Sequence, residues 1–200
     1  PTGTPGLKVE KCWWTFNMPT DHAEVSIKGG RVPDSTILGG EGEGLSVAQQ
    51  FVHESRIRQA ASSLGAAQYC IDEAVAYANE RLTWKRPLSA NQGIQFPLVE
   101  LHTEAEMLRG LVRRTAWELD RHSQLAVTHL VSMANFRATR LACEAADRAM
   151  QVHGGLGYTR HKPFEHIYRH HRRYRITEGA EEVQMRKVGA QLFGISGGRR

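Results

Sequence analysis

Cysteine is scarce in this chain of 200 residues, and its spacing fits no common cysteine site. The three cysteines, Cys12, Cys70 and Cys143, are odd in number and far apart, which argues against a disulfide framework and against a Cys-x-x-Cys zinc or redox site. No stretch approaches the roughly 20 consecutive apolar residues of a membrane span, and the first residues lack the basic start and apolar core of a signal peptide. We therefore expect a protein of the reducing cytoplasm that does not span a membrane.

Signatures of metal and hydrolytic chemistry are also missing. His166 and His170 stand four residues apart, but no glutamate lies between them as in His-Glu-x-x-His, and spacing places no third ligand, so we expect no metal site. The serines at positions 46, 55 and 89 lack the context of a nucleophile elbow, which leaves serine hydrolysis without support.

Positive charge is in modest excess, at a formal net +5, and much of it lies in residues 160–175. This run reads RHKPFEHIYRHHRRYR and holds six Lys or Arg, four His and one carboxylate. Such a run can bind nucleic acid or another polyanion. Because no recognised nucleic-acid motif accompanies it, we favour a solvated or anion-lined helix edge and expect no nucleic-acid partner.

The first 44 residues differ from the rest of the chain. Apolar and polar side chains alternate in Leu7-Lys8-Val9 and in Val25-Ser26-Ile27, as they do in half-buried strands. Two or three strands cannot form a stable sheet alone, so we interpret residues 1–44 as the remnant of a β domain and a linker. Residues 39–44 contain four glycines and mark the boundary.

Beyond this boundary the apolar spacing predicts a mainly α fold. We expect helices over residues 47–84, 94–121, 123–153, 164–174 and 180–193, with Ser46 as the first N-cap and residues 197–200 as a frayed tail. Three long amphipathic helices with short connections predict an antiparallel bundle over residues 45–196. The helix over 123–153 has a narrow face of small residues, which suits close packing. We expect this face and the Gln151–Gly155 segment to be buried against another copy of the chain.

Two local patterns suggest a bound cofactor. Arg81 at a helix end, Thr83 and Trp84 just after it, and Gln92 in the next segment could hold a phosphate and an aromatic ring. The alternative is a helix-end cation and a hydrophobic staple. The second pattern is Gln151-Val152-His153-Gly154-Gly155-Leu156-Gly157-Tyr158, in which two glycines after a helix let a ligand approach the backbone closely. The alternative is an ordinary helix C-cap.

Two further patterns suggest a reacting substrate. In Thr177-Glu178-Gly179-Ala180-Glu181-Glu182, a carboxylate beside a glycine stands between two helices. In an apolar cleft its pKa would rise, which suits a base that removes a weakly acidic C–H proton. The alternative is capping of a helix N-terminus. Arg56, in His53-Glu54-Ser55-Arg56, could meet a phosphate or carboxylate, or form a surface ion pair.

Taken in order, these patterns resemble the carboxy-terminal half of an acyl-CoA dehydrogenase, and the resemblance covers essentially the whole chain. RLTWKRPLSANQ resembles the flavin-binding segment R-x-T-F-G-x-x-L…Q, QVHGGLGYTR resembles Q-x-x-G-G-x-G-[FY], and PFEHIYRHHRRYRITEG resembles the segment that ends in the catalytic E-G. The chain departs from the family pattern at His53 (usually Asp), Trp84 (usually Phe), Lys85 (usually Gly) and Ala180 (often Thr).

The resemblance implies an enzyme that binds FAD and an acyl-CoA thioester, with Glu178 as the base that removes the α-proton. By position, Arg56 and Gly179 resemble substrate contacts, and Thr177 and Glu182 resemble contacts to the subunit's own FAD. A second set resembles contacts to the FAD of a neighbouring subunit: Arg81, Thr83, Trp84, Gln92, Gln151, Gly154 and Gly155. The resemblance therefore also implies a homodimer or tetramer, and an electron acceptor such as an electron-transfer flavoprotein.

Two readings from other classes stay open. One is a flavin monooxygenase or nitroalkane oxidase on the same fold, and the other is a non-catalytic helical interaction module. The family's amino-terminal helical domain and most of its β domain have no counterpart in this chain, so we expect the chain alone not to turn over.

Overall fold

The computed structural model describes residues 1–16 and 22–195. The chain divides into two compact units, Pro1–Gln49 and Gln50–Arg200. The expected frayed tail, residues 197–200, lies outside the described residues. No helix in the described part of the chain is both long and apolar enough to cross a membrane.

The first unit is built on one antiparallel hairpin of β1 (Leu7–Trp13) and β2 (His22–Ile27). Leu7 pairs with Ile27, and the register shifts between Val9 and Lys11. The expected strands are therefore present. Most of their side chains are exposed, including half of Trp13, so the hairpin buries little apolar surface of its own. A short 3₁₀ turn, η1 (Asp34–Thr36), follows.

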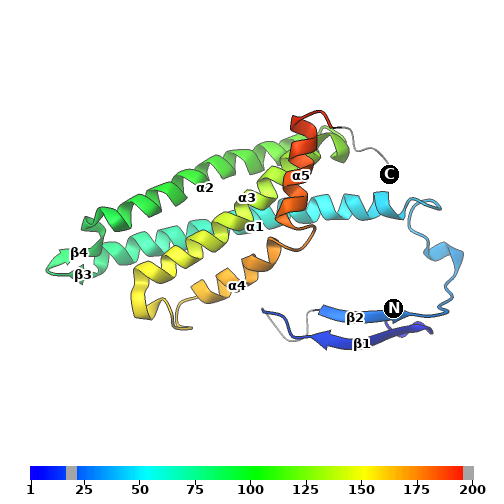
Figure 1. The fold of residues 1–200 in the computed structure, drawn as a ribbon, viewed down its shortest axis with the longest axis horizontal. Helices are drawn as coiled ribbons and strands as arrows, with labels where there is room; N and C mark the ends of the chain where they lie inside the picture. Colours follow the sequence, from blue (N-terminus) through cyan, green and yellow to red (C-terminus); the bar gives the residue numbers. More distant parts are fainter. Residues whose placement is uncertain (17–21, 196–200) are drawn as a thin grey trace. The chain divides into compact units, whose positions relative to one another are not determined.

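The second unit is helical and confirms the expected mainly α fold. Its elements are α1 (Gly44–Glu80), which begins in the first unit, β3 (Leu82–Thr83), β4 (Arg86–Pro87), η2 (Leu88–Ala90), α2 (Gln92–Leu119), α3 (Gln124–His153), η3 (Gly154–Leu156), α4 (Phe164–Tyr174) and α5 (Glu181–Leu192). Figure 1 shows α1, α2 and α3 running lengthwise, with α4 and α5 against α3.

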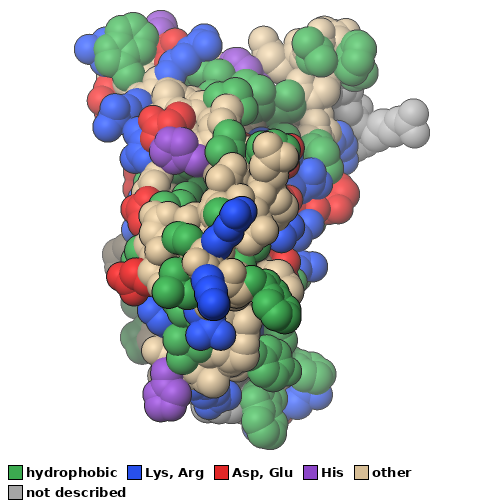
Figure 2. Space-filling model, turned by 90° about the vertical axis from the view of Figure 1, so that its left-hand side faces the viewer, with side chains coloured by type: hydrophobic (Ala, Val, Ile, Leu, Met, Phe, Trp, Pro, Cys, Tyr) green, Lys and Arg blue, Asp and Glu red, His purple; other side chains and the backbone are tan. Residues whose placement is uncertain are grey.

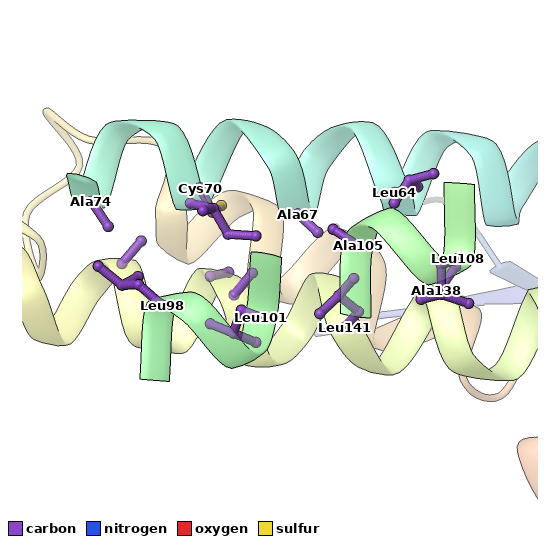
Figure 3. Close-up of a cluster of buried hydrophobic side chains, with 14 of the residues drawn as sticks. Leu64, Ala67, Cys70, Ala74, Leu98, Leu101, Ala105, Leu108, Ala138 and Leu141 are labelled. Carbon is purple, nitrogen blue, oxygen red and sulfur yellow. The ribbon is translucent and has the colours of Figure 1, made fainter. Parts of the chain in front are cut away.

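The core lies between the three long helices. Buried residues of α1 recur every three or four positions, as do those of α2 and α3, so each helix presents one apolar stripe inward. Figure 3 shows these side chains meeting; it labels Leu64, Ala67, Cys70, Ala74, Leu98, Leu101, Ala105, Leu108, Ala138 and Leu141. Phe164 of α4, with no exposed surface, joins the same core.

Three details of the sequence prediction were wrong. First, α1 begins at Gly44, so Ser46 lies inside the first turn and not at the N-cap. Second, α1 ends at Glu80 and not near Trp84, because residues 82–87 pair as a tight hairpin that the Leu88 N–H closes onto the Arg81 carbonyl at 2.8 Å. Third, the small-residue face of α3 is not free to contact another copy, since Ala134, Ala138, Ala145 and Ala149 are buried inside this chain.

Two candidate ligand sites

The β3–β4 hairpin presents an aromatic ring to solvent. Its two turn residues, Trp84 and Lys85, both have positive φ angles, of 51° and 65°. A two-residue turn of this kind normally uses Asn and Gly, since the left-handed conformation is unfavourable for other residues. The Trp84 side chain is 97% exposed. The hairpin thus exposes the large apolar side chain of Trp84 to solvent, although its backbone conformation is strained.

We expect Lys85→Gly to raise the free energy of unfolding by about 0.5–1 kcal/mol. Glycine relieves the roughly 1–2 kcal/mol cost of a left-handed lysine, less roughly 0.5–1 kcal/mol for its greater backbone entropy when unfolded. Urea denaturation measures the difference. Arg86→Gly is the matched control, because Arg86 lies in β4 without a positive φ, so glycine there should lower the free energy. A decrease at both positions would argue against strain at Lys85.

A hollow of about 410 Å³ lies beside this hairpin. Five of the seven residues predicted to contact a neighbouring subunit's flavin line it: Arg81, Thr83, Gln151, Gly154 and Gly155. Residues 70 positions apart in the sequence therefore meet at one end of the bundle. The other two do not line the hollow: Gln92 is exposed at the start of α2, and Trp84 projects into solvent.

The lining is suited to an anionic ligand that approaches the backbone. The Arg81 guanidinium has no hydrogen-bond or ion-pair partner among the described residues. A Cβ at Gly155 would meet nothing within 4 Å, and its φ angle is not in the left-handed region. Packing and backbone conformation therefore do not explain a glycine at this position, whereas close approach of a ligand would. Figure 2 looks onto this side of the molecule, where basic, acidic and apolar side chains are all exposed.

His153 is a residue of this hollow that the sequence analysis passed over. Only 2% exposed, it stacks on Tyr77 at 4.3 Å between ring centroids, and Nδ1 lies 2.8 Å from the Ala149 carbonyl. A carbonyl only accepts, so Nδ1 carries the proton and Nε2 is an acceptor, which is buried without a hydrogen-bond partner. Burial lowers the pKa of His153, which keeps the ring neutral. Its position inside the Gln151–Tyr158 pattern is the sequence feature that could have singled it out.

The second candidate site is the connection between α4 and α5. Glu178 and Gly179 both have positive φ angles, of 58° and 96°. Arg56 of α1, only 3% exposed, donates from Nε to the Glu178 carbonyl oxygen at 2.8 Å and also from Nη2. Gln184 of α5 donates from Nε2 to the carbonyls of Glu178, at 3.1 Å, and Gly179, at 3.0 Å.

Several polar groups around this turn lack a hydrogen-bond partner in the described part of the chain. The half-buried Glu178 side chain has no hydrogen-bond or ion-pair partner among the described residues. The Arg56 Nη1 and the Thr177 hydroxyl are buried without a hydrogen-bond partner. The structure thus brings together four predicted residues, Arg56, Thr177, Glu178 and Gly179, at one turn. Because Arg56 is buried, it is not the surface ion pair that the sequence left open.

The titratable side chains near Arg56 are mostly basic. Burial, then Arg56 and Lys187, lower the pKa of His53, which stands where the family pattern has Asp. Burial likewise lowers the pKa of Lys187, and Arg56 and Arg186 lower it further. A carboxylate at Glu178 is therefore the neighbour that offsets the charge on Arg56.

The next two carboxylates have different environments. Glu181, 9% exposed, accepts paired hydrogen bonds from Arg140, at 2.9 and 3.0 Å, and from Arg175, both at 2.9 Å. Hydrogen bonds from Arg175 and Arg140 lower the pKa of Glu181 to about 2. Glu182 is exposed. Glu181 thus joins α3 to the start of α5, whereas Glu182 faces solvent.

Several histidines and arginines of α4 contact neighbours inside the chain. His171 contacts the Ser63 hydroxyl through Nδ1 at 3.0 Å, and burial lowers its pKa to about 4. His170 Nε2 lies 3.1 Å from the Tyr174 hydroxyl, and Arg169 pairs with Glu165 at 2.7 Å. No group of three or more His, Cys, Asp or Glu suited to a metal occurs in residues 1–16 and 22–195.

The two candidate sites are separate within one chain. Figure 1 shows the β3–β4 hairpin at one end of the bundle and the α4–α5 connection well along it toward the other.

Comparison with known proteins identifies the class. Residues 42–193 match the family model described as acyl-CoA dehydrogenase, C-terminal domain. The chain is 33% identical over 190 residues to "Probable acyl-CoA dehydrogenase FadE2" of Mycobacterium tuberculosis, covering 94% of this chain and 47% of that protein. It is 35% identical over 193 residues to an acyl-CoA dehydrogenase of Bacillus subtilis, covering 96% and 50%.

Solved structures agree with the sequence matches. The crystal structure of an acyl-CoA dehydrogenase from Geobacillus kaustophilus superposes with a TM-score of 0.85 at 27% identity, covering 95% of this chain and 50% of that one. The chain therefore belongs to the acyl-CoA dehydrogenase family. It spans about half the length of the curated relatives it matches.

Proposed function

We propose that the complete protein is an FAD-dependent acyl-CoA dehydrogenase that converts an acyl-CoA thioester to the 2,3-enoyl-CoA. The observation that carries this proposal is the Glu178 carboxylate, which has no partner among the described residues while its backbone is held by Arg56 and Gln184. A base of this kind must be free to take a proton and fixed enough to meet it.

The residues on both candidate sites fit FAD. The hollow at the hairpin offers an unpaired arginine and a glycine backbone, which suit the phosphates of a dinucleotide. The α4–α5 connection offers the unpartnered Thr177 hydroxyl beside Glu178. When bound, FAD supplies an acceptor for the β-hydride. In our proposal Thr177 and Glu182 contact the flavin of the same subunit.

In the proposed reaction the residues of this chain bind substrate and remove a proton. Glu178 takes the α-proton next to the thioester carbonyl, and one carboxylate oxygen holds it. Arg56, whose Nη1 has no partner in the described structure, and the Gly179 backbone lie beside the substrate. An electron acceptor such as an electron-transfer flavoprotein then reoxidises the enzyme.

The separation of the two sites supports a homodimer or tetramer. If each FAD contacts the α4–α5 connection of one subunit and the hairpin hollow of its neighbour, both sets of residues serve the same cofactor. The complete site then needs two chains: Arg81, Thr83, Trp84, Gln92, Gln151, Gly154 and Gly155 come from one chain and Glu178 from the other.

Loss of the hairpin contacts should release the cofactor. In the complete protein we expect Arg81→Ala to weaken FAD binding roughly 10- to 100-fold, because a charge-assisted hydrogen bond contributes about 1.5–3 kcal/mol. Gly155→Val should also weaken it, since the new side chain would occupy the open approach. The 450 nm absorbance retained after dialysis measures FAD occupancy.

Arg86→Ala is the matched control, because Arg86 is exposed on the same hairpin and does not line the hollow. Full occupancy in both Arg81→Ala and Gly155→Val would show that the cofactor binds elsewhere. Oxygen uptake with other substrates, without acyl-CoA-dependent reduction of the flavin, would favour an oxidase or monooxygenase over a dehydrogenase.

A further inference from the structure

We propose that Gln184 is a positioning residue for Glu178, an inference that rests on the proposed function. Gln184 belongs to α5 and has no exposed surface. Its side chain reaches back to the turn before the helix, where Nε2 donates to the carbonyl oxygens of Glu178 and Gly179 at 3.1 and 3.0 Å. It therefore contacts the backbone of the proposed base and leaves the carboxylate free.

The contacts of this amide fix its orientation. The two backbone carbonyls can only accept hydrogen bonds, so the NH₂ group must face them, and it has two protons to give. The Gln184 Oε1 accepts from the Ser132 hydroxyl at 2.9 Å, and Ser132 is itself fully buried in α3. Each polar atom of the Gln184 side chain thus has a hydrogen-bond partner. These partners determine which way the amide group faces. The amide links the turn to α3 in a single arrangement.

The turn needs such support because its backbone is strained. Glu178 has a φ of 58°, a left-handed conformation that costs a non-glycine residue free energy and persists only where the surroundings hold it. The support comes from two elements, since Arg56 of α1 and Gln184 of α5 converge on the same Glu178 carbonyl oxygen. If either donor is lost, the backbone can relax and carry the carboxylate with it.

The close packing around Gly179 points to the same role. A Cβ at this residue would lie 3.2 Å from Arg56 Nη2 and 3.3 Å from Gln184 Nε2. The two donors therefore close around the turn so tightly that a Cβ at residue 179 would fit only if they shifted slightly. Gln184 thereby sets the direction in which the Glu178 side chain projects from the backbone. The geometry of proton transfer depends on that direction.

The test replaces Gln184 in the complete flavoprotein. Gln184→Met keeps the length of the side chain and removes both donors and the acceptor. We expect the limiting rate of flavin reduction at saturating acyl-CoA to fall roughly 10- to 100-fold, as for a misplaced catalytic group, without a matching change in the apparent dissociation constant. Gln191→Met is the matched control, because Gln191 is exposed on the same helix, and it should reduce its flavin at the parent rate.

A double-mutant cycle separates positioning from general destabilisation. Once Glu178→Gln has removed the base, nothing is left to position, so Glu178→Gln with Gln184→Met should be no slower than Glu178→Gln alone. Additive losses would overturn the proposal. If Gln184→Met fails to fold, Ser132→Ala takes its place. It frees the amide from α3 and should slow the reaction roughly 3- to 10-fold, the effect of one hydrogen bond; a parent rate would overturn the proposal.

These outcomes are distinguishable from failure of the proposed function. A parent rate in Gln184→Met, alongside a large loss in Glu178→Gln, overturns the role of Gln184 and leaves the reaction intact. A parent rate in Glu178→Gln overturns the reaction instead. Amide hydrogen exchange gives a readout that needs no activity: the amides of residues 178–181 should exchange faster in Gln184→Met than in Gln191→Met, and equal exchange overturns the proposal.

Discussion

Glu178→Gln in the complete protein is expected to retain FAD and to bind acyl-CoA, yet to reduce its flavin on the order of 10²–10⁴-fold more slowly. Glutamine keeps the size and polarity of the side chain and removes its ability to take a proton, and a positioned acid or base contributes a factor of that size. The α-proton of a thioester is weakly acidic, so its removal needs a base held close to it. Rapid mixing with acyl-CoA, followed at the oxidised flavin band near 450 nm or so, measures the rate.

Glu182→Gln is the matched control for this experiment. It makes the same substitution four residues away, at an exposed side chain. In our proposal Glu182 contacts the flavin but takes no proton, so flavin reduction should slow far less than in Glu178→Gln. If Glu178→Gln reduced its flavin at the parent rate, Glu178 would not be the base, and the dehydrogenase proposal would lose its main chemical support.

Glu181→Gln is expected to lower the free energy of unfolding by about 3 kcal/mol at neutral pH. Glu181 is the only carboxylate that contacts both Arg140 and Arg175 in the described structure, and removing one partner of a largely buried ion pair leaves the other charges uncompensated. Urea denaturation of the chain measures the loss. Glu182→Gln again provides the control, and equal stability of the two variants would contradict a structural role for Glu181.

The lowered pKa of the Glu181 carboxylate also predicts how the stability of the fold depends on pH. The pKa of Glu181 is about 2 in the folded chain, below its ordinary value of 4.5. A lowered folded pKa stabilises the fold above the unfolded pKa, and that stabilisation, about 3 kcal/mol here, is lost as the pH falls from about 4.5 to 2. The parent chain should therefore lose stability over this interval, and Glu181→Gln should lose less. Denaturation curves at pH 7, 4.5 and 3 or so compare them.

Regular spacing made the helical core predictable. The stripe of Ala60, Leu64, Ala67, Ile71 and Ala74 recurs every three or four residues, and all five side chains are buried, because that spacing places them on one side of a helix. The end of α1 was harder to predict. Its hairpin turn has Trp84 and Lys85 in left-handed conformations, and neither residue type signals such a turn in a sequence.

The residues of the candidate sites also divide into those that the sequence could predict and those that it could not. Arg81 and Gly155 could be singled out because they stand in short local patterns, and the fold then brings them to one hollow. Gln184 and Ser132 could not, since they are 52 residues apart in the chain and meet only through tertiary packing. Glu181 stands in the first turn of α5, as the capping alternative has it, but its carboxylate is also held by two arginines that the sequence did not single out. A carboxylate's partners depend on which helices lie beside it, which local sequence does not state.

The small residues of α3 limit what truncation experiments can reveal. Along its buried face this helix uses Ala134, Ala138, Ala145 and Ala149, each with at most 1% of its surface exposed. An alanine scan would pass over these four positions unchanged and report nothing about their packing. Enlarging substitutions are the informative ones, because an added methyl group finds no space between helices that approach this closely. A mutational map of this protein would thus leave these four positions blank or mark them as critical, depending on whether side chains are removed or enlarged.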